Sequence, residues 1–180
     1  MKTIISFVFA TFISTLCLLG QNPGNAFEVG VSCSPSSLVT ADGAENSTYK
    51  IGAYAEYRLP LGKHFDVGGR FDYKGGPLTD NFFNRKATAH SFELLALADF
   101  NMFPGKTVSP FFGIGLGPGL GAHNDTMDNM WAGHFLVFAD ARIGVDLFRH
   151  FRVSADYKLP FMGNTAHLFS TLNVNVGWVF

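Results

Sequence analysis

The chain has 180 residues, a length that suits one domain, and a formal net charge of −1 from 13 Lys and Arg against 14 Asp and Glu. Because there is no basic excess, the composition argues against a nucleic-acid partner. The 20 phenylalanines are the unusual feature, since a soluble domain of this size would have difficulty burying them all.

The N-terminal segment has the pattern of a secretory signal peptide. One early cation, Lys2, precedes an uncharged apolar run over residues 4–20, and small residues follow shortly after it. We predict a signal peptide over residues 1–26, cleaved after residue 20 or residue 26, and one domain over residues 27–180. An uncleaved membrane anchor is the alternative.

After residue 26, apolar side chains recur at every second position, which is the spacing of a β-strand. This period predicts eight strands, over residues 27–34, 48–59, 64–75, 89–101, 109–121, 133–147, 150–160 and 168–180. The connections alternate between short turns and longer segments rich in Ser, Asn, Asp, Gly and Thr, which favour turns. This alternation is typical of an up-and-down meander, so we predict an all-β fold with eight antiparallel strands closed into a barrel.

Within each predicted strand, the charged residues share one parity and therefore one face of the sheet. We predict that they line the lumen of the barrel as a charge network, made of Glu56, Arg58, Asp66, Arg70, Asp72, Lys74, Glu93, Asp99, Asp140, Arg142, Asp146, Arg152, Asp156 and Lys158. The carboxylates of Asp66 and Asp72 are expected to be neutralised by cations of the same network, namely Arg70, Lys74, Arg152 and Lys158. Paired charges would fill the lumen, so we predict no general diffusion pore.

The opposite face of the strands is apolar. In a soluble barrel such a face fills the centre, whereas in a membrane barrel it contacts lipid, and periodicity alone does not distinguish the two. Aromatic residues at the strand ends favour the membrane barrel, because interfacial girdles lie there. The predicted girdles are Phe27, Phe65, Phe151 and Phe180 at one rim and Tyr73, Phe92, Phe135 and Phe161 at the other.

The run GIGLGPGLG, residues 113–121, has glycine at every second position. A phosphate-binding loop would have to lead into a helix, and no segment after residue 26 has a sustained helical period. We therefore predict that these glycines face the lumen, where they make room for large neighbours such as Tyr54, Phe111 and Phe138.

The C-terminal segment LNVNVGWVF places Val176, Trp178 and Phe180 on one face of the last strand. This ending resembles the assembly signal of Gram-negative outer-membrane barrels. Together with the signal peptide and the strand count, the chain resembles the OmpA/OmpX-like superfamily of eight-stranded outer-membrane β-barrels over residues 27–180.

The resemblance implies export through the periplasm, a location in the outer membrane, and recognition of the last strand by the assembly machinery. We expect a monomer without a cofactor, in contact with outer-membrane lipids and lipopolysaccharide. Relatives that bind peptidoglycan do so through a domain beyond the barrel. Since this chain ends at Phe180, we do not expect that role here.

We expect a structural role in membrane integrity or a surface-interaction role, with a loop partner that the sequence does not identify. One alternative is a lipid A-modifying enzyme, because some eight-stranded outer-membrane barrels act on lipid A with His, Ser and a carboxylate. The nearest set here is His90, Ser91 and Glu93. Neighbouring residues of a strand point to opposite faces, which hinders a His90–Ser91 hydrogen bond, so we expect no enzyme.

A soluble ligand-binding barrel is the other alternative. The six histidines show no ligand spacing, so we expect no metal site.

Overall fold

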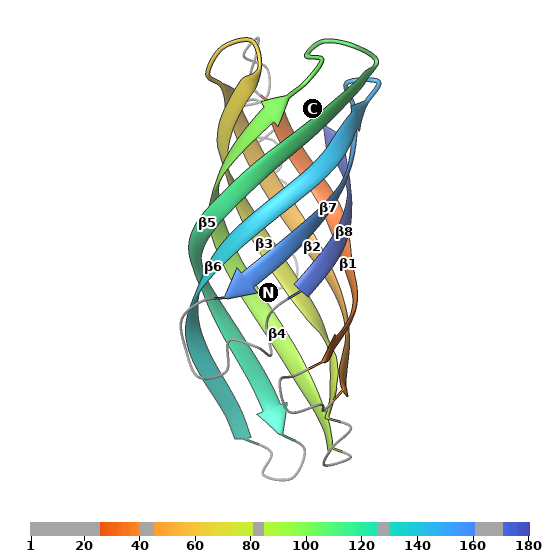
Figure 1. Cartoon of the computed structure of the whole chain (residues 1–180). Helices are drawn as coiled ribbons and strands as arrows, with labels where there is room; N and C mark the ends of the chain where they lie inside the picture. Colours follow the sequence, from red (N-terminus) through yellow and green to blue (C-terminus); the bar gives the residue numbers. More distant parts are fainter. Residues whose placement is uncertain (1–25, 40–44, 81–84, 126–129, 161–170) are drawn as a thin grey trace, which may run out of the picture.

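The structure, a computed structural model, describes residues 26–39, 45–80, 85–125, 130–160 and 171–180. The strands are β1 (Ala26–Val39), β2 (Glu45–Pro60), β3 (Phe65–Asp80), β4 (Arg85–Asn101), β5 (Val108–Asp125), β6 (Met130–Leu147), β7 (Phe151–Pro160) and β8 (Thr171–Val179). Each strand pairs antiparallel with the next, and β8 pairs with β1, which closes the sheet into a barrel (Figure 1). The predicted all-β, eight-stranded antiparallel barrel is therefore confirmed.

The predicted signal peptide falls on residues 1–26, of which residues 1–25 lie outside the described part of the chain. Within the described ranges, there is no helix long and apolar enough to cross a membrane.

The two ends of the barrel differ in how the strands are joined. At one end, which we call the turn end, short connections over residues 61–64, 102–107 and 148–150 join the strands. β1 begins and β8 ends at this turn end, which is uppermost in Figure 1. The other end, which we call the loop end, carries the four remaining connections.

Most strands continue further toward the loop end than the sequence predicted. Pairing extends to Val39 with Glu45 and to Asp80 with Arg85. The predicted limits were wrong because Ser, Asn, Asp and Gly in these segments were interpreted as turn formers. Ladder hydrogen bonds use backbone groups, so they continue through such residues once the register is set.

Side chains alternate between the interior and the exterior along the strands, as the pleat of a sheet requires. In β8, Asn173 and Asn175 are buried, whereas Leu172 and Val174 are exposed. Exposed apolar side chains of this kind form a belt around the barrel, made of Val31, Ile51, Leu59, Phe65, Phe71, Phe92, Leu94, Phe112, Ile114, Leu116, Leu120, Phe135, Ile143, Phe151, Leu159, Leu172, Val174, Val176 and Trp178.

The belt is free of charge over a large part of the wall. No outward-facing position holds Asp, Glu, Lys or Arg in the described stretches 51–59, 65–77, 90–100, 108–122, 133–147, 151–159 and 172–180. The exterior is therefore compatible with hydrocarbon, which argues against the soluble barrel.

The glycine run of β5 faces the lumen, as predicted, and its neighbours explain why glycine is needed. A Cβ atom at Gly119 would lie 2.5 Å from Cε2 of Phe138, and one at Gly115 would lie 2.7 Å from Cδ2 of Leu97. At Gly117, an added Cβ would overlap the backbone carbonyl oxygen of Leu94. Phe138 is thus a correctly predicted neighbour.

Tyr54 and Phe111 also lie in the lumen, and their closest approaches to glycines are on other strands. Tyr54 packs against β1, where a Cβ at Gly30 would lie 2.5 Å from its Cζ atom. Phe111 packs against β6, where a Cβ at Gly144 would lie 2.6 Å from its Cε1 atom.

The substitution Gly117→Ala should destabilise the barrel by about 1–3 kcal/mol, because the backbone at Leu94 would have to move. Gly69→Ala is the matched control, since the nearest atom to a Cβ there is the Leu95 carbonyl oxygen at 3.9 Å. Its effect should stay within about 0.5 kcal/mol. Equilibrium urea unfolding of the refolded barrel in lipid vesicles measures both free energies, and equal effects would contradict the inward placement of Gly117.

Candidate functional site

The inner faces of the strands carry charged side chains, and most of them are buried. The predicted lumen residues that are buried are Glu56, Arg58, Arg70, Asp72, Lys74, Glu93, Asp99, Asp140, Arg142, Arg152, Asp156 and Lys158. The other two, Asp66 and Asp146, are only partly buried and lie near the turn end. Glu28 and Lys50 are buried in the same interior.

Arg142 is the centre of a cluster in the half of the lumen nearer the turn end. From β6 it donates to both carboxylate oxygens of Glu56 on β2, at 2.7 and 2.9 Å. Its Nε atom donates to Oδ1 of Asp99 on β4 at 2.7 Å, and Nη2 donates to Oδ2 of the same residue. Bidentate contacts between Arg and a carboxylate are among the strongest hydrogen bonds in proteins, so this residue ties three strands together across the lumen.

Arg152 and Arg58 extend this cluster toward the turn end. Arg152 donates to Asp99 at 2.9 Å and to the two oxygens of Asp146 at 2.6 and 2.9 Å. Arg58 donates to Glu28 at 2.9 Å, and its Nε atom lies 3.2 Å from Oε1 of Glu56. We call the residues Glu28, Glu56, Arg58, Asp99, Arg142, Asp146 and Arg152 the Arg142 cluster.

A second cluster lies nearer the loop end and has Lys158 at its centre. The Lys158 Nζ atom on β7 donates to Asp72 on β3 at 2.6 Å and to Glu93 on β4 at 2.7 Å. Arg70 shares Asp72, with Nε and Nη2 at 2.8 and 3.0 Å from its two oxygens. Lys74 Nζ lies 3.9 Å from Oε2 of Glu93. We call Arg70, Asp72, Lys74, Glu93, Asp156 and Lys158 the Lys158 cluster.

Uncharged polar residues of β8 complete the Lys158 cluster. Asn175 donates to Asp156 at 2.7 Å and accepts from Arg70 at 3.1 Å, and Asn173 also donates to Asp156. Sequence reasoning missed these residues because it assigned only charged side chains to the lumen network. The signal was present, since Asn173 and Asn175 alternate with the apolar residues of the last strand.

Two aromatic side chains lie inside the lumen against cations. The guanidinium carbon of Arg152 lies 3.8 Å from the ring centre of Phe111, and that of Arg70 lies 4.0 Å from the ring centre of Tyr54. The Tyr54 hydroxyl donates to Glu28 at 2.5 Å. Cation–π contacts of desolvated groups stabilise by about 2 kcal/mol, so these rings support the ion pairs.

Four apolar side chains also point into the lumen. Leu95 and Leu97 of β4 and Leu136 and Phe138 of β6 form a buried cluster, beside the strand whose glycines leave room for them. Of these four, sequence reasoning placed Phe138 in the lumen and missed Leu95, Leu97 and Leu136. The signal was their parity, which matches that of the charged residues in the same strands.

Asp140 and Asp66 differ from the other lumen acids in their partners. Asp140 is 3% exposed, and neither of its carboxylate oxygens accepts a hydrogen bond from the described residues. The carboxylate of Asp66 accepts from Asn101 at 2.5 Å, and among the described residues no Lys or Arg forms a direct ion pair with it. Asp66 lies at the turn end, where Arg152 is already held by Asp99 and Asp146.

The residues considered for lipid A chemistry lie on opposite sides of β4. Ser91 is buried in the lumen and donates to Glu93 at 3.1 Å. His90 faces outward, where its Nδ1 atom lies 2.9 Å from the Tyr73 hydroxyl. In the described residues, no group of three or more His, Cys, Asp and Glu side chains could hold a metal ion.

The predicted aromatic girdles are present in part. At the turn end, Phe65, Phe151 and Phe180 are exposed, whereas Phe27 is only 4% exposed and lies with its ring centre 6.1 Å from that of Phe180. At the loop end, Phe92 and Phe135 are exposed and Tyr73 is partly buried beside Phe92. Phe161 lies outside the described residues.

The residues of the predicted assembly signal lie on the outer face of β8 and just beyond it. Val176 and Trp178 are exposed, and the Trp178 ring packs edge-on against Phe151, with ring centres 4.5 Å apart. The backbone N–H of Phe180 donates to the Phe27 carbonyl at 2.8 Å. Recognition of this strand by the assembly machinery stays a prediction.

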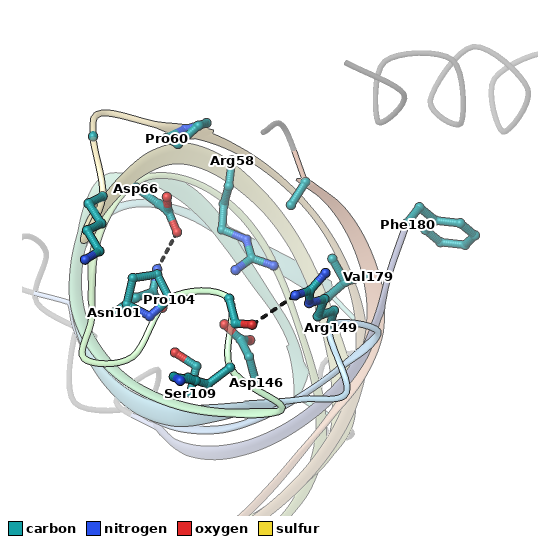
Figure 2. A pocket seen from close by; sticks show the side chains of 15 residues that line it. Arg58, Pro60, Asp66, Asn101, Pro104, Ser109, Asp146, Arg149, Val179 and Phe180 are labelled. Atoms are coloured by element: carbon teal, nitrogen blue, oxygen red, sulfur yellow. Dashed lines mark hydrogen bonds between the residues drawn. The ribbon is translucent and has the colours of Figure 1, made fainter. Parts of the chain in front are cut away.

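A cavity of about 590 Å³ opens at the turn end of the lumen. Figure 2 shows six of its lining residues around the hollow: Arg58, Asp66, Asn101, Ser109, Asp146 and Arg149. Lys63 and Lys106 also line it. Asp146 and Arg58 belong to the Arg142 cluster, so this cluster forms the floor of the cavity.

The substitution Asp99→Asn should destabilise the barrel by about 3–5 kcal/mol, because it removes a buried carboxylate that neutralises Arg142 and Arg152. Asp140→Asn is the matched control, with the same change of shape and charge at a buried acid that accepts no hydrogen bond from the described residues. It should be neutral or stabilising, since a buried carboxylate without a partner is costly. Urea unfolding in lipid vesicles measures both, and a large loss with Asp140→Asn would contradict the unpaired state of this carboxylate.

No protein-family model and no curated protein matches the chain, whereas solved structures do. Ail, the attachment invasion locus protein of Yersinia pestis, is 13% identical with a TM-score of 0.57, over 87% of this chain and 99% of that chain. Neisserial surface protein A is 15% identical with a TM-score of 0.57, over 87% and 96% of the two chains. The N-terminal β-barrel domain of Pseudomonas aeruginosa OprF is 10% identical with a TM-score of 0.50, over 87% and 98%.

These likenesses concern the fold, which extends over nearly the whole of each neighbour. The chain therefore has the fold of the small Gram-negative outer-membrane β-barrels that its sequence resembles, and its charge-free outer belt agrees with the outer-membrane location expected from that resemblance.

Proposed function

We propose that the protein is a structural barrel of the outer membrane, which contributes to membrane integrity and does not act as a general diffusion pore. The observation that carries this proposal is the Arg142 cluster, because side chains from β2, β4, β6 and β7 meet in it across the lumen.

The energetics of this cluster support a closed lumen. Removing one partner from a buried ion pair costs about 3–5 kcal/mol, because the other charge is left without compensation. Opening a continuous path would break several such pairs at once, in both the Arg142 cluster and the Lys158 cluster. A barrel of eight strands is also just wide enough for side chains to fill.

The proposal includes an orientation and a set of partners. By the resemblance, the turn end and both chain ends face the periplasm, and the four loops face outward. The apolar belt contacts outer-membrane lipids and lipopolysaccharide. The assembly machinery recognises β8 through Val176, Trp178 and Phe180. A monomer is favoured because every strand that the structure describes pairs with both of its neighbours in a closed barrel, so no strand offers an open side for pairing with a second chain.

We propose no enzymatic activity. A nucleophile and its base must lie within hydrogen-bond reach of each other, and Ser91 and His90 are on opposite sides of the barrel wall. The Glu93 carboxylate is engaged by Lys158, which favours a structural use of this acid.

Purified, refolded protein in planar lipid bilayers should give no stable conductance steps of nanosiemens size, because ion pairs fill the lumen. A general porin reconstituted in the same bilayers is the positive control. Regular nanosiemens steps from the folded protein, identified by its heat-modifiable migration on gels, would refute the closed lumen.

Surface interaction is a second candidate, and strand length favours it. A membrane-spanning strand needs about 9–11 residues, and β7 and β8 have 10 and 9. β5 and β6 have 18 residues each, so their hairpin continues well past the membrane at the loop end, as the longer ribbons of Figure 1 show. This extension offers a surface outside the bilayer.

A strain that lacks the gene should take up a hydrophobic dye faster than its parent while its lipid A stays unchanged. Plasmid-borne Ser91→Ala should restore dye exclusion as well as the wild type does, because we assign Ser91 no chemistry.

A second variant, with residues 78–87 and 123–132 each replaced by Asn-Gly, should also restore dye exclusion, because we assign the membrane role to the membrane-spanning part of the barrel. Altered lipid A would favour the enzyme, and failure of the shortened variant would favour the surface role.

A further inference from the structure

We infer that the cavity at the turn end is a binding site for a small organic anion that carries both a phosphate or carboxylate group and a hydroxyl group. The site lies directly over the Arg142 cluster, which forms its floor, and the inference does not depend on the role in membrane integrity.

Each of the three turns brings one cation to this cavity. Lys63 comes from the β2–β3 turn, Lys106 from the β4–β5 turn and Arg149 from the β6–β7 turn. In the described part of the chain, no carboxylate pairs with any of these three. The cations deeper in the barrel differ in this respect, since carboxylates neutralise Arg58 and Arg152 within the Arg142 cluster.

The balance of charge in the cavity therefore favours an anion. Two side-chain carboxylates line it, and Asp146 is neutralised by Arg152 at 2.6 Å. The other is Asp66, which among the described residues accepts a hydrogen bond from the Asn101 amide and forms no ion pair. Counted over side chains, three cations without a carboxylate partner face one such acid, and this excess of positive charge lies at the mouth, where an entering anion meets it first.

The β6–β7 turn holds Arg149 at this mouth in spite of backbone strain. Phe148 and Arg149 have φ angles of 53° and 65°, in the left-handed region that favours Gly or Asn at both central positions of a tight hairpin. Such a conformation costs about 1–3 kcal/mol for other residues and is concentrated at functional sites. A Gly or Asn would relieve the strain but would remove the guanidinium.

Hydrogen bonds between turns fix the position of Arg149. The backbone N–H of Phe148 donates to the Thr107 carbonyl at 2.7 Å, and Nη2 of Arg149 donates to the Gly105 carbonyl at 3.0 Å, the contact drawn beside Arg149 in Figure 2. A guanidinium has five N–H donors, so most of them stay available to a ligand. The same contacts hold the turn that carries Lys106 next to Arg149.

The inner part of the cavity has polar atoms that lack a partner. Ser109 is 4% exposed and Asn101 is 7% exposed. Within the described residues, the Ser109 hydroxyl and the Asn101 Oδ1 atom make no hydrogen bond. Buried polar atoms normally have a partner. A ligand hydroxyl can donate to Asn101 Oδ1, and an anionic oxygen can accept from the Ser109 hydroxyl.

The size and depth of the cavity set the class of ligand. Its volume of about 590 Å³ falls in the usual range of small-molecule sites, about 300–1,000 Å³. The Arg142 cluster closes its inner end, so a ligand enters and leaves by the same mouth. A phosphorylated polyol and a hydroxy acid both combine an anionic group for the rim with a hydroxyl for the interior.

Isotope-labelled full-length barrel in lipid nanodiscs, titrated with glycerol 3-phosphate at low salt, tests the site by NMR. Saturable shifts should be confined to residues around the cavity, including Lys63, Lys106, Ser109 and Arg149. Glycerol should shift nothing, because it lacks the charge, and propyl phosphate should bind more weakly, because it lacks the hydroxyls. Citrate, used in a second titration, shows whether carboxylates serve as well as phosphate.

The double variant Lys63→Gln/Lys106→Gln should weaken binding of glycerol 3-phosphate at least tenfold, whereas Lys63→Arg/Lys106→Arg should stay within threefold of the wild type. Both changes are at exposed turn residues, and heat-modifiable migration on gels verifies that each variant is folded. Ser109→Ala should weaken binding without a change of charge. Shifts that do not saturate, that spread over the whole surface, or that persist in the Gln variant would overturn the proposal.

Discussion

The structure depends on one constraint, which is that ionised side chains cannot face hydrocarbon. A Lys or Arg on the lipid side costs about 2–4 kcal/mol at the midplane of the bilayer. Since side chains alternate along a strand, a register shift of one residue would turn every charge of that strand outward at once. The lumen must therefore take the charges of the spanning segments, and in this narrow barrel most of them pair with one another.

Pairing in turn determines the packing of the interior. Arg142 and Lys158 each bind carboxylates from two other strands, so the lumen is braced across its width. Apolar side chains fill the part of the lumen where charges are sparse, with Leu95 and Phe138 on either side of the glycines of β5. The glycine run is the counterpart of these large side chains, and it has nothing to do with phosphate binding.

The sequence was sufficient for properties that depend on parity. Strand count, antiparallel order, the inward face of the charges and the lumen-facing glycines all follow from a period of two, which is local. The partner of each charge was not predictable, because it depends on the stagger between strands that are distant in the chain. Asp66, for example, accepts a hydrogen bond from Asn101 in the structure. The full length of the strands at the loop end was missed for another reason, since Ser, Asn, Asp and Gly there were interpreted as turn formers.

The cavity at the turn end begins where the ion pairs of the lumen end. Arg152 and Arg58 are the last cations of the Arg142 cluster, and they pair with Asp146, Asp99 and Glu28 near this end of the lumen. Beyond these two residues, the cations come from turns. Turn residues do not alternate between the two faces of a sheet, so alternation does not predict where their side chains point. Parity reasoning had no means of finding Lys63, Lys106 and Arg149 as a group, since only closure of the barrel brings three separate turns around one opening. Closure of the barrel thus pairs most charges within the membrane, whereas at its edge it brings together three cations that no carboxylate of the described residues neutralises, where an anionic ligand can be held without entering the bilayer.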